Sequence, residues 1–127
     1  MLDTTVLIDV ARRREPATSW LNNIVRHPIQ TSVSAVTVAE FFAGVRPEQR
    51  RDWQYFIDGL THWDVTKDIA IRAGILRYDL ARQGRTMQIA DALIAATAMV
   101  HGAALVTANI TDLAVPGLTT IRLEREH

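Results

Sequence analysis

The sequence predicts an α/β protein: a three-layer α/β/α sandwich with a mainly parallel central sheet of about five strands, in one domain spanning residues 1–127. Two observations predict it. Short stretches rich in β-branched and apolar residues alternate along the chain with longer stretches in which apolar residues recur at helical spacing. The chain is also long enough to bury a sizeable core, and 48% of its residues are hydrophobic.

The first element begins at the amino terminus. We expect Met1 to Thr4 to form the end of a central strand, with Thr5 capping a helix that begins at Val6. Later helices are predicted where apolar stripes continue over several turns, at residues 16–26, 35–45, 48–60, 69–83 and 89–101. Further strands are predicted at residues 29–33, 61–65, 103–107 and 118–123, the last at an edge of the sheet.

Cap residues support several of these boundaries. Ser34 is expected to cap the helix 35–45, and Thr66 or Asp68 the helix 69–83, which Gly84 ends. Residues 85–88 read as a mostly polar connection, and Asn109 and Asp112 are placed in a loop after the strand 103–107.

Composition excludes several classes of protein. The chain has no cysteine, so disulfides, thiolate catalysis and cysteine-bound zinc are ruled out. No apolar run is long enough to span a membrane, and an acid at position 3 argues against a signal peptide, so a cytoplasmic protein is expected. The net charge is zero, with Lys67 as the only lysine, and this gives no global signal for nucleic acid.

Four acidic residues occupy positions that a parallel sheet could bring together. Asp3 follows the first strand, Glu40 lies in the helix after the second, Asp91 opens the nearly all-apolar helix 89–101, and Asp112 follows the next strand. Right-handed crossovers would place all four at one edge of the sheet. Taken singly, each has an ordinary explanation as a turn residue, a solvated helix residue or a helix-dipole charge.

Clustered carboxylates repel one another unless a cation is present. An all-oxygen donor set without cysteine or a histidine pair favours Mg²⁺ or Mn²⁺ over zinc. Such ions clamp a phosphodiester and activate water for in-line attack, so phosphodiester hydrolysis is the chemistry that this set of residues fits best.

The motifs around these acids resemble a known family. Four segments are similar in order and spacing to the PIN domain. They are Asp3-Thr4-Thr5-Val6-Leu7-Ile8, Val38-Ala39-Glu40-Phe41-Phe42-Ala43-Gly44, Ile89-Ala90-Asp91-Ala92-Leu93-Ile94-Ala95-Ala96-Thr97-Ala98, and Leu105-Val106-Thr107 with Asn109 and Asp112. Single-domain chains of this length resemble the VapC toxins of toxin-antitoxin pairs.

The resemblance implies an Mg²⁺- or Mn²⁺-dependent endoribonuclease that cuts structured RNA such as tRNA or rRNA. Asp3, Glu40 and Asp91 would form the acidic triad, with Asp112 as a further ligand of the metal or of its bound water. Thr5 stands where the family usually has Asn or Ser and would orient Asp3 or a metal-bound water; Asn109 would be a polar helper.

The resemblance also implies binding partners, and the segment before Asp3 differs from the family in length. A VapB-type antitoxin would lie across the toxin, with apolar stripes around Trp20 and Trp53 as a candidate groove, although both tryptophans are equally consistent with a core position; a homodimer is also implied. Family members usually carry more apolar residues before the first acid, which implies a native start upstream of Met1 or a shortened chain.

Three other functions are compatible with parts of this pattern. A haloacid-dehalogenase-like phosphatase needs a second Asp where Thr5 stands, and a response-regulator receiver needs a lysine nearer the end than Lys67. The remaining alternative is a PIN-like module that binds RNA or protein without cutting it.

Overall fold

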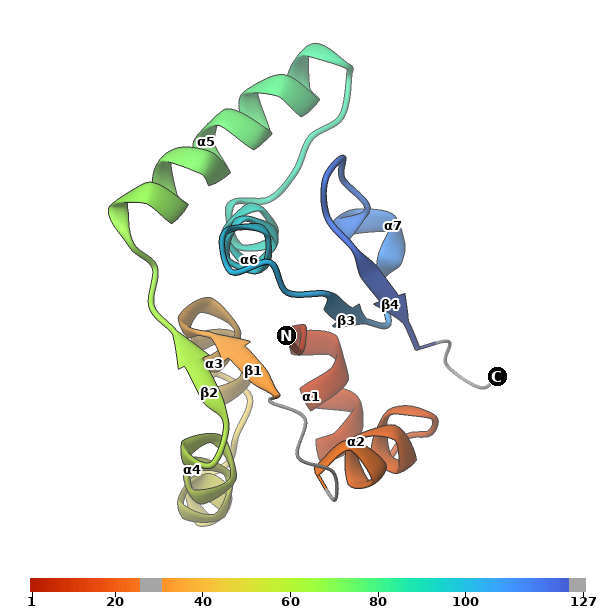
Figure 1. Ribbon diagram of the computed structural model, residues 1–127. Coiled ribbons are helices and arrows are strands. Elements are labelled where there is room, and N and C mark those ends of the chain that lie inside the picture. The colour runs from red at the N-terminus through yellow and green to blue at the C-terminus, as the bar shows by residue number, and fades with distance from the viewer. Residues whose placement is uncertain (26–30, 124–127) are drawn as a thin grey trace.

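A computed structural model describes residues 1–25 and 31–123 (Figure 1). In chain order the elements are α1 (Thr4–Ala11), α2 (Ala17–Val25), β1 (Ser32–Ser34), α3 (Ala35–Phe42), the 3-10 helix η1 (Pro47–Gln49), α4 (Arg50–Asp58), β2 (Thr61–Trp63), α5 (Lys67–Arg82), α6 (Ile89–Val100), β3 (Leu105–Thr107), α7 (Ile110–Leu113) and β4 (Thr120–Arg122).

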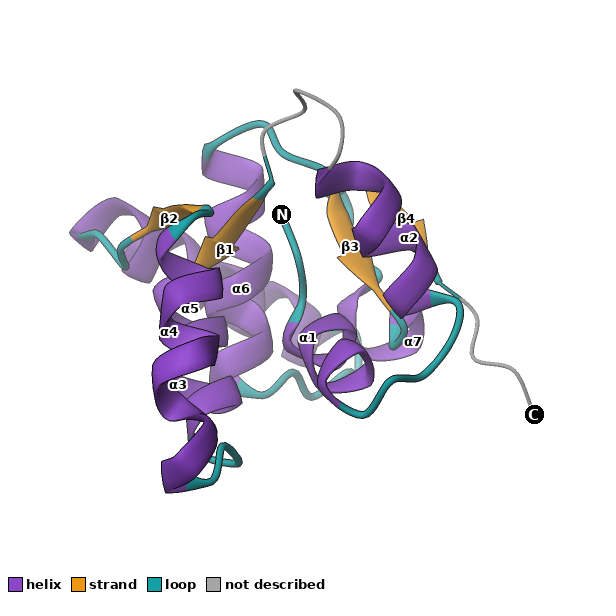
Figure 2. Cartoon of the chain, turned by 90° about the horizontal axis from the view of Figure 1, so that it is seen from below, coloured by secondary structure: helices purple, strands orange, loops and turns teal. Residues whose placement is uncertain are grey.

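The strands form two parallel pairs with the amino-terminal segment between them. β1 pairs with β2 and β3 pairs with β4, and Leu2 bridges in parallel to Val33 of β1 and to Val106 of β3. The backbone N–H of Leu2 donates to Ser32 (2.8 Å), and that of Asp3 donates to Val106 (2.9 Å). Figures 1 and 2 both show the amino terminus between β1 and β3. The predicted first strand is thus reduced to a short central bridge, and the sheet is entirely parallel where it is paired.

Side chains on the two faces of the sheet enter two different cores, because neighbouring residues of an extended chain point to opposite faces. Leu2 and Val106 join a cluster with residues of α1, α2, α3 and α4. Met1 and Leu105 join a second cluster that is built mainly from α5 and α6. Figure 1 shows α1 and α2 on one side of the strands and α5 and α6 on the other. The predicted α/β/α arrangement is therefore confirmed.

Local capping explains where two of the helices begin. The Ser34 hydroxyl accepts a hydrogen bond from the N–H of Thr37 (3.0 Å) at the start of α3, and the Thr66 hydroxyl accepts one from Ile69 (3.2 Å) at the start of α5. After α5, Gly84 adopts a positive φ of 79°, a conformation that glycine tolerates. These cap residues were predicted from the sequence.

Several predicted boundaries were wrong. Asp3, not Thr5, caps α1, because its own carboxylate accepts from the N–H of Thr4 and the helix begins there. α3 stops at Phe42 rather than residue 45, a 3-10 turn precedes α4, and the predicted loop with Asp112 contains the short helix α7. The predicted strand at 29–33 and the end of the helix at 26 fall partly on residues 26–30, outside the described residues.

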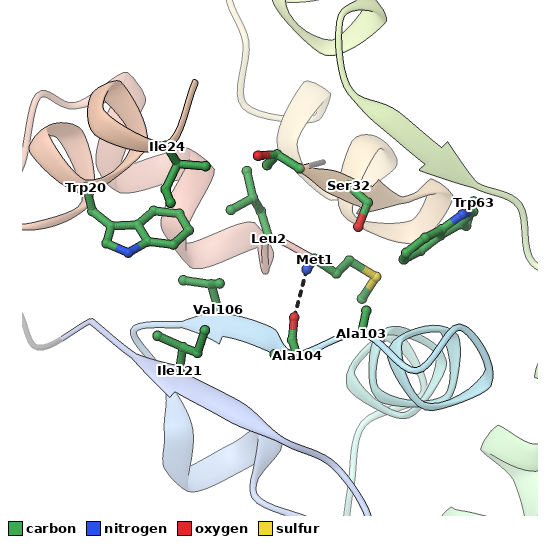
Figure 3. Close-up of a pocket in the computed structure, with 11 residues that line it drawn as sticks. Met1, Leu2, Trp20, Ile24, Ser32, Trp63, Ala103, Ala104, Val106 and Ile121 are labelled. Atoms are coloured by element: carbon green, nitrogen blue, oxygen red, sulfur yellow. Dashed lines mark hydrogen bonds between the residues drawn. The ribbon is translucent and has the colours of Figure 1, made fainter. Parts of the chain in front are cut away.

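A large apolar cavity of about 380 Å³ is lined by residues of the amino-terminal segment, of α2 and of the strands and the segments before them. Figure 3 shows its lining residues, which include Trp20 of α2, Trp63 at the end of β2 and Ala103 before β3. The amino-terminal ammonium donates to the carbonyl of Ala104 here (2.7 Å), and burial lowers its pKa. Among residues 1–25 and 31–123, no helix combines the length and the apolar character needed to cross a membrane.

Candidate active site

Asp3 is the most firmly held of the predicted acids. It is only 3% exposed, and it lies where the central segment leaves the sheet and enters α1. Its Oδ1 accepts from the backbone N–H of Thr4 (2.8 Å), while its Oδ2 accepts from the hydroxyls of Thr5 (2.9 Å) and Thr107 (2.8 Å). These three donors fix the rotamer of a buried carboxylate and compensate the cost of removing it from water.

Thr5 also forms a hydrogen bond with the segment that directly follows β3. Its Oγ1 accepts a hydrogen bond from the N–H of Ala108 (3.2 Å), and the Thr107 hydroxyl accepts one from the N–H of Asn109 (2.9 Å). The two hydroxyls therefore tie Asp3 to the segment that leads into α7. The predicted contact between Thr5 and Asp3 is present in the structure.

Glu40 reaches the same region from α3. Although Glu40 is exposed, its Oε1 accepts a short hydrogen bond (2.7 Å) from the hydroxyl of the buried Thr4. The Thr4 hydroxyl also lies 3.4 Å from that of Thr37, which in turn accepts from Ser34 (3.1 Å). A chain of buried hydroxyls thus links the end of β1 to the carboxylate of Glu40.

Asp91 sits in the first turn of α6, as predicted, and is partly buried. Desolvation and the negative charges of Asp3, Asp112 and Glu40 raise its pKa to about 6 from an ordinary value of 3.8. The three other predicted acids are therefore all close enough to Asp91 to act on its ionisation, so the structure brings the four carboxylates into one electrostatic group.

Asp112 belongs to α7, a four-residue helix that follows β3. Its Oδ2 accepts a hydrogen bond from the side-chain amide of Asn109 (2.8 Å), the residue predicted as a polar helper. Asp112 also lines a small polar cavity of about 200 Å³ together with Arg85, Gln88 and Asp91. This cavity, and not the large apolar one, lies beside the acidic group.

The donor set fits a hard divalent cation. Within residues 1–25 and 31–123, no group of three or more acidic or histidine side chains stands close enough together to hold a metal ion. Mg²⁺ does not require such a cage, because it retains several waters and is bound through one or two carboxylates. Oxygen ligands and the charge repulsion around Asp91 suit Mg²⁺ or Mn²⁺ better than a zinc ion.

The site contains polar residues that the sequence prediction did not include. Thr107 contacts Asp3 across 104 residues of chain, and Thr4 contacts Glu40 across 36. Each had one available signal: Thr107 ends a buried strand at the edge that carries Asp3, and Thr4 directly follows that acid. Arg85, from the connection before α6, donates to backbone carbonyls of the α7 segment.

The two tryptophans of the predicted groove have structural roles. Trp20 lines the apolar cavity, and Trp53 packs edge-to-face on Phe41 with ring centroids 5.1 Å apart. Both are partly buried against the same core cluster, and each leaves part of its surface exposed.

The fold and the acidic group define a class of α/β proteins with carboxylates gathered at the carboxyl edge of a parallel sheet. Residues 1–114 match the family model of the PIN domain. Over 110 residues the chain is 31% identical to Ribonuclease VapC19 and 32% identical to Ribonuclease VapC10, both of Mycobacterium tuberculosis, covering 87% of this chain and 88% and 82% of those proteins. The chain therefore belongs to the PIN domain family and, within it, to the VapC-type ribonucleases.

Solved structures agree. VapBC2 from Rickettsia felis, bound to a DNA fragment from its promoter, superposes with a TM-score of 0.82 at 23% identity and 98% coverage of both chains, which shows a shared fold. A toxin-antitoxin complex from Klebsiella pneumoniae gives a TM-score of 0.78 at 29% identity, covering 96% of this chain and 98% of that chain.

Proposed function

We propose that this protein is an Mg²⁺- or Mn²⁺-dependent endoribonuclease toxin that hydrolyses phosphodiester bonds in structured RNA such as tRNA or rRNA. The observation that carries the proposal is the grouping of Asp91 with Asp3, Glu40 and Asp112 at the edge of the sheet, where burial and, after it, the charges of these three acids raise the Asp91 pKa to about 6. The names of the curated relatives, which are ribonucleases, support the reaction class.

Asp3, Glu40, Asp91 and Asp112 are proposed to hold the metal, directly or through its waters. When bound, the ion supplies positive charge that offsets the carboxylates and the charge that develops on the phosphate. The rest of the work falls to the protein. Thr5 orients Asp3, and Asn109 orients Asp112, through hydrogen bonds of 2.9 Å and 2.8 Å.

Ionisation of Asp91 sets a lower pH limit for this site. A protonated carboxyl binds a cation poorly, so Asp91 must lose its proton before the metal can bind. Because its pKa is raised to about 6, metal affinity and cleavage should both fall as the pH drops below this value.

The experiment is cleavage of total cellular RNA by the wild-type protein and by Asp91→Asn, with Mg²⁺, with Mn²⁺ and with chelator. Discrete fragments that require metal and disappear in the variant are expected. Asp64→Asn, which removes an exposed carboxylate between β2 and α5, is the matched control and should cut like the wild type. Intact RNA with both metals would favour the alternative of a PIN-like module that binds without cutting.

We also propose a VapB-type antitoxin as the neutralising partner. The similar structures include a toxin-antitoxin complex from Klebsiella pneumoniae and a DNA-bound VapBC from Salmonella typhimurium, the latter with a TM-score of 0.80 at 26% identity. We expect the active toxin to arrest growth by cutting cellular RNA, so co-expression of a cognate VapB-type antitoxin should relieve that arrest. Persistent arrest in the presence of a soluble, folded antitoxin would count against it.

A homodimer is proposed through the outer face of α5. Ile71, Ile75 and Tyr78 are 51%, 56% and 62% exposed and follow one another at helical spacings of four and three residues. A stripe of this kind is suited to burial against a second copy. Ile75→Glu should therefore shift the molar mass in light scattering from dimer to monomer, whereas Tyr55→Glu, at an exposed position of α4, should not.

A further inference from the structure

Arg85 connects two parts of the chain that carry acids of the proposed site. It lies between α5 and α6, six residues before Asp91, and its side chain crosses to the segment of α7 that carries Asp112. One terminal nitrogen, Nη2, donates to the carbonyls of Thr111 and Asp112, both at 3.1 Å, and Nη1 donates to the carbonyl of Ala114.

Two of these acceptors are carbonyls of α7 that the helix cannot satisfy itself, and the third belongs to Ala114, the residue that directly follows the helix. α7 has only four residues, and the last four carbonyls of any α-helix have no partner within the helix. A cation at this end also faces the negative pole of the helix dipole. The planar guanidinium can reach several carbonyls at once, which a lysine ammonium, a single compact charge, does less well.

Two kinds of contact hold this short helix beside α6. Leu113, at 1% exposure, packs into the apolar core cluster that α5 and α6 build. Asp112 itself is exposed, and its carboxylate is bonded to Asn109 on the same segment, so this hydrogen bond does not reach the connection before α6. The guanidinium of Arg85 adds a polar contact to the apolar packing, and it comes from the connection that leads directly into α6 and Asp91.

We propose that Arg85 is a positioning residue that sets the distance between Asp112 and Asp91 and thereby the affinity of the site for a divalent ion. The inference rests on the proposed metal-dependent function. Both terminal nitrogens of Arg85 donate to carbonyls of the α7 segment, so its side chain is placed to orient α7.

The test is a titration of the full chain with Mn²⁺, in which binding is measured as the loss of the electron paramagnetic resonance signal of free Mn²⁺. Arg85→Ala should weaken binding by about 10-fold or more, the usual cost of losing a residue that orients metal ligands. Arg85→Lys keeps the positive charge but loses the planar guanidinium that reaches several carbonyls. Its Mn²⁺ affinity should therefore lie between those of the wild type and Arg85→Ala. Arg82→Ala removes the same charge from α5, where Arg82 contacts only Tyr78 in the described structure, and should bind like the wild type.

A double-mutant cycle of Arg85 and Asp112 distinguishes a positioning role of Arg85 from a general loss of structure. If Arg85 acts through Asp112, adding Arg85→Ala to Asp112→Asn should cause little further loss of Mn²⁺ affinity. An equal loss in both backgrounds, wild-type affinity in Arg85→Ala, or full affinity in Arg85→Lys would overturn the proposal. Circular dichroism at the assay temperature checks that each variant is folded.

The same experiment distinguishes failure of the inference from failure of the proposed function. If the wild type binds Mn²⁺ and Asp91→Asn does not, the metal site stands, and only the Arg85 variants decide the inference. If the wild type binds no Mn²⁺, or Asp91→Asn binds it equally well, the proposed metal site is wrong and the role of Arg85 is overturned with it.

Discussion

Replacing Asp91 by Asn should stabilise the metal-free protein, because it removes a charge that is partly desolvated and is also repelled by the neighbouring carboxylates. The Asp91 pKa is raised from 3.8 to about 6 by burial and by Asp3, Asp112 and Glu40. A shift of about two pKa units corresponds to roughly 3 kcal/mol. Since Asp91 is partly exposed, solvent screening reduces this to about 1 kcal/mol. The melting temperature should then rise by about 3 to 5 °C.

The upward shift of the Asp91 pKa determines how the stability of the folded protein depends on pH. Between pH 3.8 and about 6 the folded wild type holds more protons than the unfolded chain, so its stability falls as the pH rises through this window. Above pH 6 the whole penalty is present; below 3.8 both states are protonated and it vanishes. The advantage of Asp91→Asn should therefore be absent near pH 3.5 and complete by pH 7.

The assay is thermal unfolding in chelator from pH 3.5 to 8, with Asp64→Asn as the control for loss of an exposed carboxylate. Excess Mg²⁺ should raise the melting temperature of the wild type more than that of Asp91→Asn, because ligands stabilise the state that binds them. An Asp91→Asn protein that is no more stable than the wild type at pH 7, or equally stabilised at every pH, would refute the reasoning.

Three further variants test individual contacts. Thr4→Val removes the hydroxyl that donates to Glu40 and should weaken Mn²⁺ binding by about 10-fold, whereas Thr4→Ser should preserve it. Thr107→Val deprives the Asp3 Oδ2 of one of its two hydroxyl donors, so RNA cleavage should fall by roughly 10-fold, with recovery in Thr107→Ser. Leu7→Ala opens a cavity at a fully buried position and should lower the free energy of urea unfolding by about 2 to 5 kcal/mol; a loss below 1 kcal/mol would contradict that placement.

Long periodic elements were the part of the fold that the sequence predicted well. α5 and α6 have sustained apolar spacing and definite end signals in Thr66, Gly84 and Gly102, and both helices lie where expected. The order of strands and helices also predicted the three layers correctly. The four predicted acids are drawn together because their positions after the strands follow from that order.

Short elements and competing caps were not resolved by sequence. Asp3, Thr4 and Thr5 are all residues that cap helices well, so their order did not decide which of them caps α1. α7 has four residues, too few for a periodic pattern to be recognised. The first strand is supported by pairing on both sides of Leu2 rather than by its own length.

Contacts between distant polar residues were the least predictable feature of the site. Thr107 bonds to Asp3, which lies 104 residues away in the chain, and Arg85 bonds to Asp112, which lies 27 residues away. These contacts depend on where β3 and α7 pack in the folded protein. A hydroxyl at a strand end and an arginine in a polar connection look ordinary in a sequence. Only the packed structure shows that they hold Asp3 and the segment with Asp112.

The most direct test of a metal-dependent ribonuclease is the cleavage of total cellular RNA by antitoxin-free protein, measured with Mg²⁺, Mn²⁺ or chelator, with Asp91→Asn alongside. We expect discrete fragments with either metal, none with chelator, and none with the folded variant. Fragments that persist unchanged in chelator or in Asp91→Asn, or intact RNA with folded wild-type protein and both metals, would contradict a metal-dependent nuclease built on these four carboxylates.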